Sequence, residues 1–485
     1  MNDLRGLTDI SEKSTILVVD LDGTLIHTDT LYESAIWCLF HNGVELRNAL
    51  DAFRRGGIAA MKEALANAYD LDPKHLPYNQ SVLEFLEEKR NAGYKLVLAT
   101  GANHTIATAI AEHLQLFDDV LASSSNRNNT SLEKINSIKA KYRSFDYVGN
   151  SRADVSVWKE SRYGYVVVDS ATNLQKKAGK QLTTIGRTKR KTFKGWLTQL
   201  RPHQWAKNAL LAVSIIASHR YLEIDSWSKV LFGFAAFSLL ASAVYIFNDL
   251  SDLSNDRRHS DKRNRPLASG RINAPLALFL SVLLVIVSFA IAYNTSQPFA
   301  GCLVLYLAAN IAYTFKLKKV VIVDVMLLAF MYTARIWAGA VLIDEPMSFW
   351  IASFSVFIFL SLALLKRYSE ILAETKSGDE AIVGRGYRAG DSALVLSSGL
   401  SSAFSSVIFL ALYLDSQAVV TKYSDPSWLW GTVPLLLGWL LSLWFRASRG
   451  SVNQDPIFFA LRDKFSQVTF VALAVLFMCA TFVSQ

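Results

Sequence analysis

The long apolar runs in the second part of the chain constrain its fold more than any other feature. From about residue 205 onward, runs of roughly 17–24 residues recur between short polar loops. A helix of about 20 apolar residues crosses a hydrocarbon core of ~30 Å. Nine runs fit this description, the first being the weakest: 207–221, 229–248, 274–293, 297–315, 319–342, 347–366, 392–414, 427–445 and 466–484. We predict an all-α polytopic membrane bundle of about nine helices, with eight as the alternative.

The distribution of Lys and Arg predicts an orientation for this bundle. With the N-terminal part in the cytoplasm, the four loops on that side hold most of the basic residues. The opposite loops offer Arg220, Lys229 and Lys422. Because positive charge favours the cytoplasmic side, we predict an integral protein of the cytoplasmic (inner) membrane. Its N-terminal domain and its active-site loops then face the cytoplasm.

A basic segment precedes the first apolar run. We assign residues 171–195 to a juxtamembrane linker, in which each basic side chain adds about 1 kcal/mol of attraction to anionic lipid. A solvated linker that only sets topology is the alternative. The net charge of +9 therefore does not require nucleic acid as a partner. The basic side chains are Lys176, Lys177, Lys180, Arg187, Lys189, Arg190, Lys191 and Lys194.

Residues 1–170 alternate between strand and helix patterns. The apolar run in STILVVDLDGT is typical of a buried parallel strand and ends at Asp20. YKLVLATG, FDYVGNSRAD and YGYVVVDS predict further strands, and helical patterns such as NQSVLEFLEEKRNAG lie between them. Ligands bind at the carboxyl ends of strands in an open α/β sheet. The polar residues that follow these strands are therefore candidates for a site.

These motifs, in this order, resemble the haloacid-dehalogenase superfamily of phosphotransferases. The resemblance implies a Rossmann-like α/β domain over 1–170, with a small helical cap at about 30–80. It implies Asp20 as the nucleophile that forms an acyl-phosphate and Asp22 as the general acid and base. Thr100 and Lys134 would hold the phosphoryl group. Mg²⁺ would bind near Asp20, Asp22, Asn150 and Asp154.

One position departs from the pattern of this superfamily. Asn150 stands where the superfamily usually has Asp, which removes one negative charge from a site for a hard cation. The sequence therefore leaves two interpretations open. The domain is an active phosphatase, or it is a former phosphatase kept as a regulatory or assembly module.

The segment FNDLSDLSNDRRHSDKRNRPLASGRI lies between two apolar runs. Read as a helix, it places Asp249, Asp252 and Asp256 at steps of three and four, so that they share one face. Carboxylates clustered near a membrane are candidates for function, and Mg²⁺ bridging to a diphosphate is their natural partner. A basic loop set by topology, or a set of surface salt bridges, is the plainer alternative.

This arrangement resembles the UbiA-type superfamily of intramembrane transferases, in which nine helices surround a cavity. The second motif of that superfamily is reduced here to AYTFKLKKVVIVDV, with the single carboxylate Asp324. Together with RPHQWAKN, LLKRYSE and DPIFFALRDK, this reduced motif resembles the decaprenyl-phosphate phosphoribosyltransferase family over residues 196–485.

The resemblance implies transfer of 5-phosphoribose from phosphoribosyl diphosphate to a polyprenyl phosphate. Mg²⁺–diphosphate would bind at Asn248, Asp249, Asp252 and Asp256. Arg257, Arg263, Arg265, Tyr313 and Lys316 would contact phosphates, and Asp324 would assist the metal or the ribose hydroxyls. Lys366 and Arg367 are candidates for the 5-phosphate, and Gln204 and Lys207 for the lipid phosphate.

The fusion of the two domains suggests consecutive steps, in which the N-terminal domain removes the 5-phosphate of the transferase product. The alternatives are a prenyltransferase acting on an aromatic or haem-like acceptor beside a regulatory domain, and a non-catalytic scaffold. The intramembrane Arg335 is either a ligand contact or a structural partner of a carbonyl or of Asp324. The sequence leaves homo-oligomerisation open.

Overall fold

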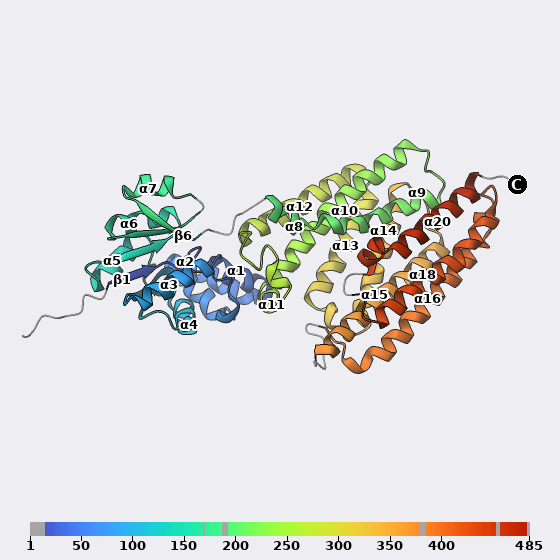
Figure 1. Cartoon of the computed structure of the whole chain (residues 1–485). Helices are drawn as coiled ribbons and strands as arrows, with labels where there is room; N and C mark the ends of the chain where they lie inside the picture. Colours follow the sequence, from blue (N-terminus) through green and yellow to red (C-terminus); the bar gives the residue numbers. More distant parts are fainter. Residues whose placement is uncertain (1–14, 169, 187–192, 378–384, 453–455, 483–485) are drawn as a thin grey trace, which may run out of the picture. The chain divides into compact units, whose positions relative to one another are not determined.

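The structure, a computed structural model, describes residues 15–168, 170–186, 193–377, 385–452 and 456–482. These residues divide into two compact units (Figure 1). The first contains the described parts of 1–201 together with 245–282, and the second contains those of 202–244 and 283–485. Part of the predicted basic linker, residues 187–192, lies outside the described residues.

A six-stranded parallel sheet forms the centre of the first unit, in the order β3-β2-β1-β4-β5-β6. Strand β1 pairs with β2 on one side and with β4 on the other. Because the strand order reverses beside β1, the carboxyl ends of β1 and β4 flank the crevice where such sheets bind ligands. The strands are β1 (Ile16–Val19), β2 (Lys95–Asn103), β3 (Asp119–Ser123), β4 (Asp146–Gly149), β5 (Gly164–Val167) and β6 (Leu182–Gly186).

Helices cover both faces of this sheet. Alternate side chains of β1 point to opposite faces, so Leu17 packs in one core with helix α4, and Val18 packs in a second core with Trp158 of helix α6. The α/β prediction is confirmed. The α-helices of this part are α1 (Thr30–His41), α2 (Gly43–Ala68), α3 (Gln80–Asn91), α4 (His104–Leu114), α5 (Leu132–Lys141), α6 (Val155–Glu160), α7 (Thr172–Ala178) and α8 (Phe193–Leu200).

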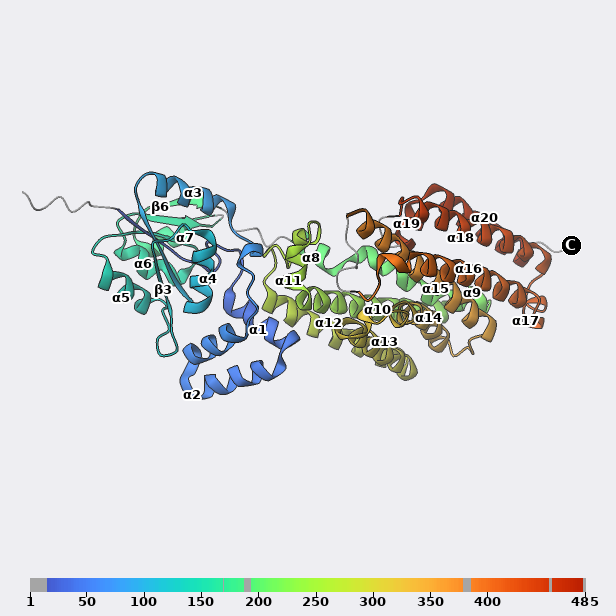
Figure 2. The ribbon, with the colours of Figure 1, turned by 90° about the horizontal axis from the view of Figure 1, so that it is seen from below.

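Helices α1 and α2 form the predicted cap and pack on each other through Cys38, Ala49 and Leu65. Figure 2 shows this pair apart from the layers of the sheet. The predicted domain boundary at residue 170 needs a correction, because α7 and β6 belong to the sheet domain. Strand β6 has an exposed middle, with one fully buried side chain, so its sequence LTTIG does not read as an apolar core strand.

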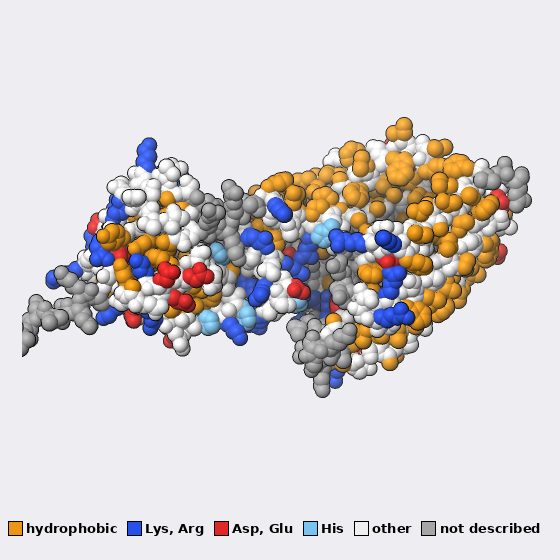
Figure 3. All heavy atoms as spheres, in the orientation of Figure 1, with side chains coloured by type: hydrophobic (Ala, Val, Ile, Leu, Met, Phe, Trp, Pro, Cys, Tyr) orange, Lys and Arg blue, Asp and Glu red, His pale blue; other side chains and the backbone are white. Residues whose placement is uncertain are grey.

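The second unit is a bundle of helices. Eight helices among the described residues are long and apolar enough to cross a membrane. This confirms the polytopic all-α prediction and is roughly consistent with a count of about nine. Figure 3 shows hydrophobic side chains over the visible face of this bundle. The remaining α-helices are α9 (Val213–Ala217), α10 (Ile224–Ser251), α11 (Leu253–Arg258), α12 (Ala274–Thr295), α13 (Gln297–Phe315), α14 (Val323–Leu342), α15 (Phe349–Ser377), α16 (Ser392–Leu414), α17 (Gln417–Val420), α18 (Thr432–Ser448), α19 (Pro456–Arg462) and α20 (Lys464–Phe482).

Helix α14 is the central helix of the bundle. Val325, Ala329 and Ile336 belong to one hydrophobic core with α15, α16 and α18, whereas Met331 and Ala338 belong to another with α10 and α13. Helices α15, α16 and α18 meet at Ser361, whose hydroxyl accepts from the Trp444 indole at 3.1 Å and donates to the Gly399 carbonyl at 2.8 Å.

The first predicted run, 207–221, departs from a regular membrane helix. It lies in a 3₁₀ helix, η3 (Pro202–Ala212), followed by the short α9. With a rise of about 2.0 Å per 3₁₀ residue and 1.5 Å per α residue, the two elements span about 30 Å. The segment is therefore as long as a membrane core is thick. The other 3₁₀ segments are η1 (Pro73–His75), η2 (Arg152–Asp154), η4 (Lys262–Asn264), η5 (Leu317–Lys319), η6 (Ala389–Asp391) and η7 (Pro426–Gly431).

Candidate active sites

The first candidate site lies at the carboxyl end of β1. Asp20 is buried, and its Oδ1 accepts a hydrogen bond of 2.7 Å from the Lys134 ammonium, which helix α5 supplies. The Thr24 hydroxyl donates to Asp20 Oδ2 at 3.3 Å. A carboxylate held by an ammonium and a hydroxyl, with its strand fixed on both sides, is suited to attack on phosphorus.

The residues after β4 complete this end of the sheet. Asp154 is buried, and its carboxylate accepts hydrogen bonds from the Tyr147 hydroxyl at 2.6 Å and from the backbone N–H groups of Asn150 and Ser151. Lys134 Nζ lies 3.8 Å from Asp154 Oδ1 and therefore bridges Asp154 and Asp20. The sequence motifs of β1, α5 and β4 thus converge on one ammonium.

Asp22 and Asp20 differ in their electrostatic surroundings. Burial raises the pKa of Asp22 to about 8, and the nearby Asp29 carboxylate adds to this rise. The pKa of Asp20 is also raised by burial, but the Lys134 charge opposes the rise and the value is about 6. The Lys134 charge therefore favours the ionised form of Asp20, whereas burial and the Asp29 carboxylate favour the protonated form of Asp22, in the direction that a nucleophile and a proton donor require.

Thr100 and Lys62 occupy the β2 side of the site. Thr100 is fully buried, and its hydroxyl accepts from the Ala102 N–H at 3.0 Å. Lys62, from cap helix α2, donates to the Gly101 carbonyl at 2.6 Å and to Asn128 Oδ1 at 2.9 Å. The cap therefore brings a cation to the site that the sequence motifs do not include.

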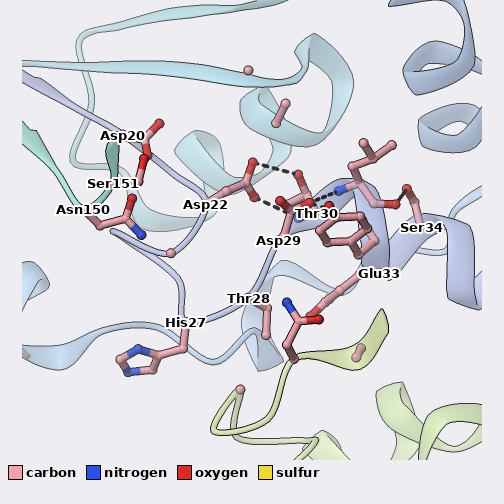
Figure 4. A pocket seen from close by; sticks show the side chains of 18 of the residues that line it. Asp20, Asp22, His27, Thr28, Asp29, Thr30, Glu33, Ser34, Asn150 and Ser151 are labelled. Atoms are coloured by element: carbon pink, nitrogen blue, oxygen red, sulfur yellow. Dashed lines mark hydrogen bonds between the residues drawn. The ribbon is translucent and has the colours of Figure 1, made fainter. Parts of the chain in front are cut away.

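These groups line a cavity of about 850 Å³ within the first unit. Its wall includes Asp20, Asp22, Lys62 and Lys134, and it continues to residues 253–275 of the segment between α10 and α12. Figure 4 shows Asp22 directed toward Thr30, whose backbone N–H donates to it at 2.8 Å. Small-molecule sites have volumes of about 300–1,000 Å³, so this cavity accepts a sizeable substrate.

The oxygen donors at this site fit Mg²⁺. Asp20, Asp154 and the Asn150 amide supply hard oxygen atoms around the ends of β1 and β4. Within the described ranges, no three acidic, His or Cys side chains lie close enough together to hold a metal ion alone. Mg²⁺ suits such a site because it uses one or two carboxylates and completes its shell with water and phosphate oxygens.

The second candidate site begins at the end of α10. Arg265 Nη1 lies 3.1 Å from Asp249 Oδ1 and 2.6 Å from Asp256 Oδ2, so one nitrogen joins the first and last carboxylates of the predicted motif. Arg201 adds a contact of 2.6 Å to Asp249, and the Gln199 amide donates to it at 2.7 Å. These two carboxylates therefore converge, as the spacing predicts, and they fit Mg²⁺ in the same sense as the first site.

The helix carrying this motif is interrupted at Asp252, which is the N-terminal cap of α11. The i to i−4 backbone bonds continue across the break, since Asp252 N–H donates to Asn248 and Asp256 N–H donates to Asp252. Burial raises the pKa of Asp256 to about 6, although the Arg265 charge opposes the rise. Arg263 is exposed, and Asn248 and Asp252 are half-buried.

Arg257 requires a revised interpretation. The sequence predicts a phosphate contact, but the structure pairs its guanidinium with Glu33 of cap helix α1 at 2.8 and 2.5 Å. Arg257 Nε donates to the Ala268 carbonyl at 3.0 Å, and the Tyr69 hydroxyl donates to Glu33 at 3.3 Å. Both charged groups are buried.

A third set of predicted residues meets in the second unit. Asp324 and Arg367 are both fully buried and form an ion pair of 2.7 Å. The Tyr313 hydroxyl accepts from Arg367 at 3.3 Å and from Arg385 at 2.6 Å. The structure thus brings together three of the residues predicted from the reduced second motif and LLKRYSE. Lys316 is exposed and Lys366 half-buried.

Arg335 is a structural partner rather than an open ligand contact. Its guanidinium donates to Asn208 Oδ1 at 2.9 Å, to the Met331 carbonyl at 2.6 Å and to the Tyr306 hydroxyl at 2.7 Å. It therefore ties η3 to α13 and α14. The Tyr332 ring lies 5.5 Å from Arg335 and 5.5 Å from Lys207.

A second cavity, of about 520 Å³, lies within the bundle beside η3. Its wall is almost entirely apolar, with Leu210, Phe354 and Trp439 among its side chains. Of the described residues that line it, Lys207 is the one with a charged side chain. The cavity combines a place for an apolar chain with a cation. The other lipid-phosphate candidate, Gln204, is half-buried in η3.

Sequence reasoning missed several residues that the structure places at the sites, among them Lys62, Glu33, Gln199, Arg201 and Arg385. Glu33 and Lys62 lie in cap helices whose charges follow an ordinary amphipathic pattern. Arg201 is the first residue of the quoted RPHQWAKN motif, and this motif carried the one available signal.

The fold and the sites define a class: an α/β phosphotransferase-like domain joined to a polytopic bundle with an aspartate-rich loop. The sequence profile of the UbiA prenyltransferase family matches residues 209–481, over half of the chain, and the chain belongs to this family. Residues 17–157 match the profile of the haloacid dehalogenase-like hydrolases.

The chain is similar to several known proteins. The uncharacterized protein y4nM of Sinorhizobium fredii is 36% identical over 486 residues, which cover 99% of this chain and 94% of that protein. The decaprenyl-phosphate phosphoribosyltransferase of Mycobacterium tuberculosis is 36% identical over 188 residues, which cover 38% of this chain and 62% of that protein. A solved UbiA homolog from Archaeoglobus fulgidus, bound to GPP and Mg²⁺, is 17% identical and covers 58% of this chain and 99% of that one, with a TM-score of 0.44.

Proposed function

We propose that this membrane protein transfers 5-phosphoribose from phosphoribosyl diphosphate to a polyprenyl phosphate and releases diphosphate. We propose further that its N-terminal domain removes the 5-phosphate of the product. The observation that carries the proposal is the convergence of Asp249 and Asp256 on one nitrogen of Arg265. Carboxylates gathered beside arginines, at the end of a membrane helix, suit a diphosphate bound through a divalent cation.

The charge around Asp324 supports a phosphoribosyl donor. This donor carries a 5-phosphate in addition to its diphosphate, so its site needs more cations than a site for a prenyl diphosphate. Asp324 is the single carboxylate of the reduced second motif. Arg367 pairs with Asp324 and also with Glu370, and Arg367 and Arg385 both donate to the Tyr313 hydroxyl, with Lys366 contributing further positive charge near Glu370. The similarity to the Mycobacterium tuberculosis decaprenyl-phosphate phosphoribosyltransferase supports this donor.

The apolar cavity beside η3 supports a lipid phosphate as the acceptor. Its apolar wall suits an isoprenoid chain, and Lys207 supplies positive charge for the phosphate. Burial of apolar surface contributes about 0.8 kcal/mol for each CH₂ group, so even part of a polyprenyl chain would bind there with useful affinity.

In the transferase reaction, the bond between C1 of ribose and the diphosphate oxygen breaks, and the electron pair leaves with diphosphate. The oxocarbenium-like C1 is then attacked by an oxygen of the lipid phosphate. An anionic nucleophile needs no strong base, so the arginines act by binding and orienting. Mg²⁺, held by Asp249, Asp252 and Asp256, would supply charge that stabilises the leaving group.

In the phosphatase reaction, Asp20 attacks phosphorus and Asp22 gives its proton to the departing 5-oxygen of ribose. Lys134 orients Asp20 and neutralises phosphoryl charge. Asp22, now ionised, takes a proton from water, and the hydroxide oxygen attacks the phosphorus of the aspartyl phosphate. Inorganic phosphate leaves and both carboxyl groups return to their first state.

The segment 202–217 supports the proposed orientation in the cytoplasmic membrane. With a length of about 30 Å, η3 and α9 are long enough for a ninth crossing, which would put the N-terminal domain and the loop after α10 on the same side. Both belong to the first unit.

A labelled donor tests the transferase. Phosphoribosyl diphosphate labelled in the ribose should place label in the lipid phase when polyprenyl phosphate and Mg²⁺ are present. Asp249→Ala should abolish this transfer, whereas the exposed-pair variant Arg54→Ala should keep it. Transfer of label from a prenyl diphosphate to an aromatic acceptor, without transfer from phosphoribosyl diphosphate, would contradict the proposal and favour prenyl transfer.

The product lipid tests the phosphatase. Protein with Asp20→Asn should still make the lipid-linked 5-phosphoribose but release no inorganic phosphate from it. Continued release at the wild-type rate would show that the N-terminal domain is not the phosphatase.

A further inference from the structure

We propose that residues 253–275, which connect two membrane helices of the transferase, form a substrate-selecting wall of the phosphatase site. This wall makes the site prefer phosphomonoesters carried on a lipid over soluble ones. The inference rests on the proposed phosphatase activity and deepens it by naming the class of substrate and the chain segment that selects it.

The cavity itself is the first observation. The catalytic groups Asp20, Asp22 and Lys134 line one part of it, and residues 253–275 line another. The side chains that this segment contributes are mostly apolar: Leu253, Leu267, Ile272, Ala274 and Pro275, together with Arg257, Gly270 and Asn273. A wall of this composition is suited to an isoprenoid group rather than to a small hydrophilic phosphate.

The buried ion pair between Arg257 and Glu33 is the second observation. The Arg257 guanidinium binds two partners at the same time: the Glu33 carboxylate of cap helix α1 and the Ala268 carbonyl of residues 253–275. The positive charge of Arg257 is thereby matched, so this part of the wall carries little net charge. The same bonds fix the segment against the cap at a defined place.

The third observation is a close approach at Gly270. Its φ of +72° is a backbone conformation that glycine adopts without strain. A Cβ atom there would lie 2.8 Å from His27 Cβ and 3.1 Å from Thr28 Cγ2. His27 and Thr28 line the cavity and lie between the catalytic β1 loop and α1. The segment therefore touches the phosphatase loop too closely for any other residue.

The fourth observation is the place where the wall ends. Ala274 and Pro275 line the cavity and are the first residues of α12, a helix long and apolar enough to cross a membrane. The apolar end of the cavity is thus continuous with the beginning of a membrane helix. A lipid chain beside the first residues of α12 would therefore meet apolar side chains at this end of the cavity.

The chemistry follows from this placement. The phosphomonoester oxygen–phosphorus bond breaks at Asp20, and a water oxygen replaces the alcohol, so the net products are inorganic phosphate and a lipid-linked ribose. Atoms and charges balance without any further reactant. The wall acts on the part of the substrate that does not react, and so it changes selectivity rather than the chemical steps.

The test uses the full-length protein in nanodiscs and two substrates with the same reacting end. One is the lipid-linked 5-phosphoribose made by the transferase, and the other is ribose 5-phosphate. For the wild-type protein, kcat/KM should be at least about tenfold higher for the lipid-linked substrate than for ribose 5-phosphate. A single methylene group in an apolar pocket already changes kcat/KM by about tenfold or more. This comparison needs no variant.

Gly270→Val should lower the preference for the lipid-linked substrate by about tenfold or more, because a shift of about 1 Å in a positioning group has effects of this size. Gly179→Val is the matched control, since Gly179 has a φ of +67° but nothing within 4 Å of an added Cβ. It should leave the preference unchanged.

Equal kcat/KM values for the two substrates in the wild type would overturn the inference. Equal loss of both activities in Gly270→Val would also overturn it, because the segment would then be only structural. If Asp20→Asn continues to release phosphate from the lipid, the proposed phosphatase assignment fails instead. The two failures are therefore distinguishable.

Discussion

The buried ion pair between Arg257 and Glu33 allows a quantitative prediction. Arg257→Ala leaves the Glu33 carboxylate, which is 3% exposed, beside the Tyr69 hydroxyl but without its cation. Removing one partner of a buried pair costs about 3–5 kcal/mol. Coulomb's law gives a similar value of about 4 kcal/mol for charges 4 Å apart at an effective dielectric constant of 20. We expect the free energy of unfolding of the first unit to fall by about 3–5 kcal/mol in Arg257→Ala.

Hydrogen–deuterium exchange of peptides from α1 measures this loss in the full-length protein. For a unit of this size, a loss of about 3–5 kcal/mol corresponds to a fall in Tm of roughly 6–20 °C. Arg54→Ala is the matched control, because its partner Asp51 lies 2.9 Å away in the same cap but the Arg54 side chain is 78% exposed. That variant should lose at most about 0.5 kcal/mol.

A double variant separates the charge from the packing. Glu33→Leu combined with Arg257→Met removes both charges and keeps apolar volume, so it should be more stable than Arg257→Ala. If Arg257→Ala exchanges no faster in α1 than Arg54→Ala, the pair contributes little, and the argument that it fixes the segment against the cap is refuted.

Two further predictions concern pH and packing. Burial raises the pKa of Glu33, but the Arg257 charge and the hydrogen bonds from Arg257, Thr28 and Tyr69 together lower it more, so the net pKa lies below its usual value of about 4.3. The pair therefore stabilises the folded first unit above that pH, and this contribution is lost as pH falls through the lowered pKa. In Arg257→Ala, the protection of α1 amides should instead rise on acidification. Hydrogen–deuterium exchange across pH 3–7 would show the difference. In the bundle, an added Cβ at Gly399 would lie 2.1 Å from the Trp444 ring. Gly399→Val should therefore destabilise the protein by about 1–3 kcal/mol in thermal melts in detergent. Gly438→Val is the control and should melt near the wild type, because nothing lies within 4 Å of an added Cβ there.

The sequence predicts the catalytic end of the sheet well, because its residues follow strands. Asp20 and Lys134 are 114 residues apart. Each nevertheless lies in a motif whose strand or helix can be predicted from the neighbouring residues alone. Parallel strands bring their carboxyl ends to one edge, so local reading was enough. The converging carboxylates of the second site follow from helical spacing for the same reason.

Other features have no local signal. Glu33 and Arg257 are 224 residues apart, and each belongs to an ordinary charged helix or loop. The run 207–221 is apolar, but apolar content does not distinguish a 3₁₀ helix from an α-helix. Strand β6 has a single fully buried side chain, so it reads as part of a basic linker.

The discontinuous first unit has a consequence for biogenesis. A ribosome adds about 5–20 residues per second, so Arg257 is synthesised roughly 11–45 s after Glu33. During that interval the nascent cap contains Glu33 before its partner Arg257 has been synthesised. The chain that is made in the meantime includes η3 and α10, which must first enter the bilayer. Translation and insertion therefore precede completion of the phosphatase cavity, and a released N-terminal fragment would never acquire its last wall.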